Sequence, residues 1–235
     1  VSMSLIHLCV TRPLTPPVEG TDLVIFSDIK NYVAQWDNQN FLASCKKYAQ
    51  SYGVYLLTSR VVADGYLCLF LFDDKGKIIG GQRAVSLNLS YRGTLSRSTD
   101  LNIVRTKFGN LFLAVDVDIY RPEILRAAAL SGAEIILSSQ FIPLYDYQSQ
   151  KLGQLAFQAA DNGVYIVNVS NASTSVIAPV ETASCPGGFL VREDDSVPLF
   201  YSLDTGLYKK SSDPASPLAR LRPALYEKYA SYLGR

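Results

Sequence analysis

Short apolar runs alternate along the chain with longer segments in which apolar residues recur at helical intervals. Runs of this kind, bounded by Gly, Pro, Asp or Asn, are typical of buried strands. The predicted strands span residues 5–10, 23–26, 54–57, 66–72, 77–79, 110–119, 135–137, 164–169, 187–192 and 199–203. These runs are therefore expected to form the buried strands of the fold.

The segments with helical spacing predict four helices, at 33–52, 123–130, 147–161 and 218–233. Pro122 suits the first turn of the second helix, because a proline there sacrifices no helical hydrogen bond. Gly53, Gly132 and the pair Asn162-Gly163 provide C-terminal stop signals. Strands and helices thus alternate along the chain.

The order of these elements predicts a layered α/β fold with mixed sheets. The apolar run 66–72 is followed by the turn Asp73-Asp74-Lys75-Gly76 and a returning run at 77–79, which together form a hairpin. A hairpin pairs antiparallel strands, so the sheets are not purely parallel. Layered α/β folds of this length are commonly a single unit, and we predict one domain over residues 1–235.

Composition and charge narrow the class of protein. With 48% hydrophobic and 18% charged residues, the chain is typical of a globular protein with a sizeable core. The net charge of +1 includes no basic block that would neutralise a run of phosphates, so we expect no nucleic-acid partner. The apolar runs are too short to span a membrane, and we expect a cytoplasmic protein.

The cysteines and the one histidine exclude several kinds of site. His7 is the only histidine, which argues against Ser-His-Asp and Cys-His mechanisms. The four cysteines are widely separated and show no spacing typical of zinc sites or redox pairs; we expect buried thiols at Cys9, Cys45, Cys68 and Cys185. We predict neither a cofactor nor a metal requirement.

Three ordered motifs carry a resemblance to a known family. Residues 109–126 resemble the nitrilase (carbon-nitrogen hydrolase) pattern I-C-Y-D-x-R-F-P-E-x-x-R, matching at Asp118, Pro122, Glu123 and Arg126 and continuing to Gly132-Ala133. Residues 20–28 are similar to the strand that ends in the family's catalytic Glu, and residues 74–95 to the segment that carries its catalytic Lys. Their order agrees with the family.

The resemblance implies a four-layer αββα sandwich, commonly paired through a helical face into a dimer. We therefore expect a homodimer, or a hetero-oligomer with a related subunit. Family members carry a long helix between the first strand and the strand ending in Glu, whereas only residues 12–20 intervene in this chain. The missing helix is expected to thin one outer layer and to expose apolar sheet surface.

By the same resemblance, the catalytic Glu, Lys and Cys positions are occupied by Asp28, Gly93 and Asp116. The family's mechanism uses a thiolate nucleophile, a Glu that transfers protons and a Lys that stabilises the oxyanion. Asp28 is shorter than Glu by a methylene group, Gly93 lacks a cation, and Asp116 is expected near Asp28 without an adjacent cation. We predict that the hydrolase chemistry is lost and that the protein is a binding or regulatory protein.

Two further functions and a metal hypothesis stay open. One is a carbon-nitrogen hydrolase acting on an amide-type molecule through a rebuilt site, with Asp28 and Asp116 as acid and base; another is a small-molecule binder that retains the pocket. Asp28, Asp116 and Asp118 also suggest a cation site, but we favour a structural hydrogen bond for Asp118. The candidate pocket residues are Arg92, Asp118, Glu123 and Cys185.

Overall fold

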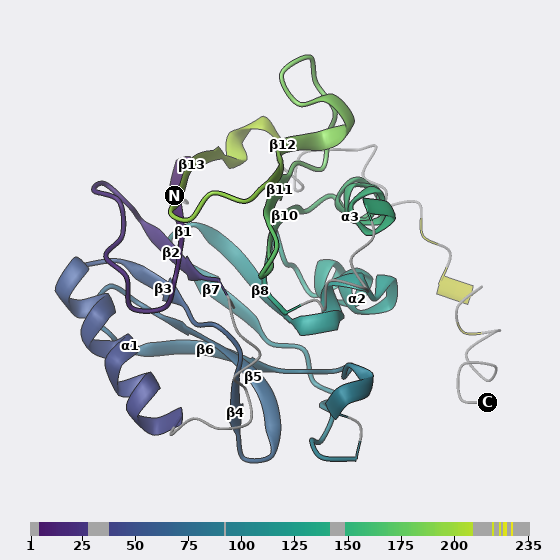
Figure 1. Ribbon diagram of the computed structural model, residues 1–235. Helices are drawn as coiled ribbons and strands as arrows, with labels where there is room; N and C mark the ends of the chain where they lie inside the picture. The colour runs from purple at the N-terminus through teal and green to yellow at the C-terminus, as the bar shows by residue number, and fades with distance from the viewer. Residues whose placement is uncertain are drawn as a thin grey trace.

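Two β-sheets face each other in the structure, and helices cover the outer side of each sheet (Figure 1). The structure is a computed structural model that describes residues 5–27, 38–91, 93–141 and 149–208, and, beyond these, Leu218, Leu221, Pro223, Ala224 and Glu227. Three α-helices lie within these ranges: α1 (Asn38–Tyr52), α2 (Pro122–Leu130) and α3 (Ser149–Asn162).

The first sheet consists of strands from the N-terminal part of the chain and one late strand. Its members are β1 (Leu5–Thr11), β2 (Leu23–Phe26), β3 (Tyr55–Leu57), β4 (Val61–Ala63), β5 (Tyr66–Phe72), β6 (Ile78–Arg83) and β13 (Leu199–Asp204). The order is β13-β1-β2-β3-β5-β4, and β6 also pairs with β5. Strands β1, β2 and β3 run parallel, whereas β5 and β6 form the predicted antiparallel hairpin.

The second sheet contains the strands from the middle of the chain. They are β7 (Ile103–Thr106), β8 (Gly109–Val115), β9 (Ile135–Ser139), β10 (Tyr165–Val169), β11 (Thr174–Ile177) and β12 (Phe189–Asp194), in the order β12-β11-β10-β9-β8-β7. Strands β8, β9 and β10 are parallel. The remaining elements are short 3-10 helices: η1 (Leu89–Tyr91), η2 (Asp116–Tyr120), η4 (Pro186–Gly188) and η5 (Thr205–Leu207).

Three apolar clusters lie between adjacent layers. The largest lies between the sheets and joins, for example, Leu69 of β5 to Leu113 of β8. A second cluster seals α2 and α3 against the second sheet, and a third seals α1 against the first sheet through residues such as Cys45 and Phe26. The order helix, sheet, sheet, helices confirms the predicted four-layer αββα sandwich.

The carboxyl ends of the parallel strands in both sheets meet at one side of the sandwich. Ser139, at the end of β9, donates its hydroxyl hydrogen bond to the carbonyl oxygen of Phe26, at the end of β2, over 2.9 Å. In α/β folds the carboxyl ends of parallel strands are the usual place for ligand sites. This edge is therefore where the candidate site is sought.

Several predicted elements are confirmed, and others differ. The helix at 123–130 begins with Pro122 as predicted, whereas strands β4, β7 and β11 were not predicted. The prediction of a strand through residue 119 is wrong after Val115, because the chain turns there into η2. Residues 33–37 of the first predicted helix and most of the C-terminal helix at 218–233 lie outside the described residues.

No helix forms between β1 and β2, as predicted, so α1 alone among the described helices covers the first sheet. The outer face of the β1 and β13 pair is consequently open at Leu5 and Phe200, whose side chains are 43% and 39% exposed. His7 stacks on Phe200 with its ring centroid 5.7 Å away. None of the helices that the structure describes is long and apolar enough to cross a membrane.

Candidate functional site

Asp116 stands at the centre of the candidate site, directly after β8 and at the start of η2. Its backbone has a φ of +52°, in the left-handed region that few non-glycine residues adopt. Aspartate tolerates this region better than most residues, although the conformation still costs about 1 kcal/mol or more. The turn ends the strand and directs the Asp116 side chain into the space between the two sheets.

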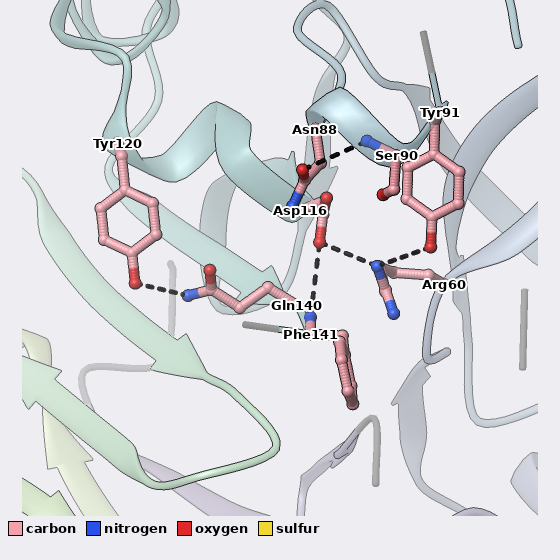
Figure 2. Close-up of polar contacts among 8 residues, drawn as sticks. All are labelled: Arg60, Asn88, Ser90, Tyr91, Asp116, Tyr120, Gln140 and Phe141. Atoms are coloured by element: carbon pink, nitrogen blue, oxygen red, sulfur yellow. Dashed lines mark hydrogen bonds and ion pairs between the residues drawn. The ribbon is translucent and has the colours of Figure 1, made fainter. Parts of the chain in front are cut away.

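A buried ion pair joins Asp116 to Arg60, which follows β3 in the opposite sheet (Figure 2). Nη1 of Arg60 lies 2.9 Å from Oδ1 of Asp116, and each side chain is only 1% exposed. The same nitrogen lies 3.5 Å from the hydroxyl oxygen of Tyr91, and the guanidinium carbon lies 5.6 Å from the centre of the Phe141 ring. Arg60 is therefore enclosed on several sides.

The two carboxylate oxygens of Asp116 have different environments. Oδ1 accepts hydrogen bonds from Arg60 and, over 3.4 Å, from the backbone N–H of Phe141. Oδ2 is buried without a hydrogen-bond partner. Burial raises the pKa of the Asp116 carboxyl, and the Arg60 guanidinium and the Phe141 amide act against this rise.

Gln140 extends the polar region along the ends of β9 and β10. Its side-chain nitrogen donates to the hydroxyl of Tyr120 over 3.1 Å and to the side-chain oxygen of Asn168. The Ser138 hydroxyl donates to the same Asn168 oxygen over 2.7 Å, while the side-chain oxygen of Gln140 is buried without a partner. Figure 2 shows Tyr120, Gln140 and Phe141 from left to right, with Asp116 next to the Phe141 amide.

Asp118 holds a neighbouring loop in place. Its two oxygens accept backbone hydrogen bonds from Val85 over 3.0 Å and from Ser86 over 2.6 Å. Burial raises the pKa of this carboxyl to about 7, against the effect of the two amide donors, and the negative charge of Asp116 adds to the rise. Asp118 thus accepts two backbone hydrogen bonds that hold the loop at residues 85–86.

The comparisons with known proteins identify the family of this chain. The family model described as carbon-nitrogen hydrolase matches residues 19–199. The chain belongs to the carbon-nitrogen hydrolase family. A comparison with curated protein sequences found no significant match.

Solved structures of a nitrilase-superfamily amidase from Nesterenkonia AN1 share the fold of this family member. A mutant of that amidase is 17% identical, with a TM-score of 0.73, and the match covers 97% of this chain and 98% of that one. A mutant in complex with butyramide is 17% identical, with a TM-score of 0.74 and 97% of each chain covered. Another mutant, with the acetamide moiety of fluoroacetamide added at the active site cysteine, is 16% identical, with a TM-score of 0.73 and 97% of each chain covered.

Asp28, which the resemblance placed at the catalytic Glu position, and Arg92, a candidate pocket residue, lie outside the described residues. Gly93 is exposed in a turn with a φ of +82°, at the wall of a surface cavity. Glu123 is exposed in the first turn of α2 and takes no part in the hydrogen bonds of Asp116.

The cysteines and the acidic residues can be placed as well. Cys185 is fully buried in the core between the sheets, where its sulfur lies 3.0 Å from the hydroxyl oxygen of Thr182. All four cysteines are free and buried, which confirms the prediction of buried thiols. Within the described ranges, no three His, Cys, Asp or Glu residues are grouped as ligands of a metal ion.

Arg60 is the site residue that the sequence analysis missed. The expectation that Asp116 lies without an adjacent cation is wrong, because the Arg60 guanidinium contacts it directly. A signal was present: Thr58-Ser59-Arg60 follows the apolar run 54–57, at the carboxyl end of a predicted strand. Polar residues at such strand ends are candidates for a site, but the motif comparison drew attention only to family positions.

Proposed function

We propose that this member of the carbon-nitrogen hydrolase family does not hydrolyse carbon-nitrogen bonds and acts as a binding or regulatory protein. One observation carries the proposal: the position at which the resemblance expects a nucleophilic cysteine holds an aspartate in a buried ion pair with Arg60. We also propose that Asp28 occupies the position of the family's catalytic Glu and that Gly93 occupies the position of its catalytic Lys.

The ion pair opposes the use of Asp116 as a nucleophile. A nucleophile must approach the substrate carbon closely, but the Asp116 side chain is 1% exposed and its Oδ1 already accepts two hydrogen bonds. Attack by the carboxylate on an amide would convert it into a neutral acyl anhydride. Arg60 would then be left as a buried cation without its counter-charge, which costs roughly 3 to 5 kcal/mol.

Among the described residues, the cation in contact with Asp116 is Arg60, which does not occupy the position of the family's oxyanion lysine. Gly93, at the position that the resemblance assigns to lysine, contributes no side chain and lies in an exposed turn. The Arg60 guanidinium is the cation in contact with Asp116, and its charge is already balanced by that carboxylate. A positioned oxyanion donor supplies roughly 3 to 4 kcal/mol of transition-state stabilisation, so its loss slows the family reaction about 100- to 1000-fold.

Ammonia release measures the proposed loss of activity. The purified protein is incubated with butyramide, other simple amides, carbamoyl compounds and nitriles, with an active amidase as the positive control. We expect no ammonia above the buffer level. Asp64→Asn is the matched control, because it makes the same chemical change at an exposed aspartate. Turnover that disappears in Asp116→Asn but persists in Asp64→Asn would refute the proposal.

The same assay tests the alternative of a rebuilt catalytic site. The observation in its favour is the buried Oδ2 of Asp116, which has no hydrogen-bond partner and is therefore free to accept a proton. Under that alternative, the rate depends on both Asp28 and Asp116. Loss of ammonia release in Asp28→Asn and in Asp116→Asn separately, with both variants folded, would establish it in place of a non-catalytic protein.

We propose in addition that the protein forms a homodimer, or a hetero-oligomer with a related subunit, through the outer helical layer. Leu130 of α2 and Phe157 of α3 are 58% and 65% exposed there, which supports an apolar contact. Native mass spectrometry is expected to show a dimer that dissociates in Phe157→Lys and persists in Leu89→Lys, a 72% exposed leucine of η1. A monomer at micromolar concentration would contradict the homodimer.

A further inference from the structure

A surface cavity of about 450 Å³ opens at the loop that Asp118 anchors. Its walls come from the segment that Asp118 anchors and from the residue that follows η2: Ser86, Leu87, Gly93, Leu95, Arg97 and Arg121. Ser86 donates its backbone N–H to Asp118, and Tyr91 of the same segment contacts Arg60. The cavity and the buried site therefore share one supporting loop. Small-molecule sites commonly have volumes of roughly 300 to 1000 Å³.

The lining carries two positive charges and no negative charge. Arg97 and Arg121 contribute guanidinium groups, and neither Asp nor Glu is among the lining residues. Both residues are exposed, and neither side chain has an ion pair within the described part of the chain. The arginines Arg60, Arg83 and Arg126, by contrast, each have a carboxylate partner. Two guanidinium groups that face one cavity leave it electropositive.

Asp118 attracts the Arg121 guanidinium, which opposes the rise of the Asp118 pKa, but this carboxyl group does not line the cavity. Asp118 is fully buried, and its two oxygens already accept the backbone hydrogen bonds of Val85 and Ser86. A ligand in the cavity would meet the exposed guanidinium groups first. Guanidinium groups donate paired, charge-assisted hydrogen bonds whose geometry matches the oxygens of carboxylates and phosphates.

We propose that this cavity binds a small molecule through an oxyanion group, a carboxylate or a phosphate, held between Arg97 and Arg121. The inference rests on the proposed binding function and gives it a ligand class. Gly93 lines the cavity without a side chain, and the space beside it is open, since an added β-carbon would meet no atom within 4 Å. Leu87 and Leu95 offer apolar contacts to the rest of such a ligand.

Isothermal titration calorimetry tests the proposal with two probes, inorganic phosphate and succinate, at constant ionic strength set with sodium chloride. We expect saturable binding of at least one probe at a single site. Arg97→Ala and Arg121→Ala should each weaken that binding about tenfold or more, because each removes a charge-assisted contact. Arg97→Lys and Arg121→Lys, which keep the charge but lose the paired geometry, should have intermediate effects.

Arg105→Ala is the matched control, since Arg105 is exposed on β7 and does not line the cavity. Binding of phosphate alone or of succinate alone identifies the oxyanion source. Failure of both probes to saturate, or an equal loss of affinity in Arg105→Ala, overturns the proposal. Urea unfolding of each variant confirms that the fold is intact. Calorimetry does not depend on turnover, so a chain that releases ammonia and binds phosphate refutes only the proposed loss of activity.

Discussion

Replacing Arg60 with methionine should destabilise the protein by about 3 to 5 kcal/mol near pH 8, because the change leaves a carboxylate buried without its counter-charge. The burial and short distance of this ion pair support a loss of stability at the upper end of the range usual for ion pairs. Both side chains are 1% exposed, and the pair distance is 2.9 Å. After the change, Asp116 would keep the backbone amides of Phe141, at 3.4 Å, and of Val117 as hydrogen-bond donors, but no cation in contact.

Urea unfolding followed by circular dichroism measures this loss. Arg83→Met is the matched control, because Arg83 lies 3.5 Å from Asp64 in a pair whose side chains are 49% and 82% exposed. Exposed pairs contribute about 0 to 1 kcal/mol, so the control should change little. The double variant Arg60→Met with Asp116→Asn should lose less free energy of unfolding than the sum of the losses in the two single variants, by about 1 kcal/mol or more.

The pH dependence of the Arg60→Met variant gives a second measurement of the same pair. Burial raises the pKa of Asp116, and removal of the Arg60 guanidinium takes away the main influence against that rise. A carboxyl with a raised pKa in the folded state favours folding when it is protonated, so stability falls as the pH rises. The variant should therefore lose more stability at pH 8 than at pH 5. A loss under about 1 kcal/mol at pH 8, equal to that of Arg83→Met, would refute the reasoning.

Three further predictions concern other parts of the molecule. The pKa of Asp118 is raised to about 7, so the free energy of unfolding should fall as the pH rises from about 4 to 7, and Asp118→Asn should reduce this slope; an unchanged slope contradicts the assignment. Gly80→Ala would place a β-carbon against the Val104 side chain and should cost about 1 to 3 kcal/mol in urea unfolding, partly recovered by adding Val104→Ala. Gly153→Ala, in a helix with open space, is its control and should not destabilise. A thiol reagent should label the native protein very slowly and the urea-unfolded protein at all four cysteines; rapid native labelling would contradict their burial.

The layered fold of this protein and its family follow from local patterns and motifs in the sequence. Apolar runs with turn residues at their ends marked most strands, and Pro122 and Gly132 marked α2, because strand and helix periods are local properties of the chain. The ordered motifs then predicted the αββα arrangement, and the match to the family model over residues 19–199 agrees with them. The short strand β4 escaped prediction because three residues, Val61 to Ala63, carry too little periodic signal.

The residues that surround Asp116, by contrast, could not be predicted from the sequence. A strand that continued to residue 119 would place Asp116 and Asp118 on one face. The left-handed turn at Asp116 instead directs Asp116 to Arg60, while Asp118 accepts from the amides of Val85 and Ser86. Arg60 comes from the opposite sheet, so no local pattern relates it to its partner 56 positions along the chain. Likewise, Arg97 and Arg121 line one cavity because η2 returns the chain to the loop that Asp118 holds. Contacts between layers depend on how the two sheets pack, and hydrophobic periodicity specifies which face is buried but not which polar groups meet there.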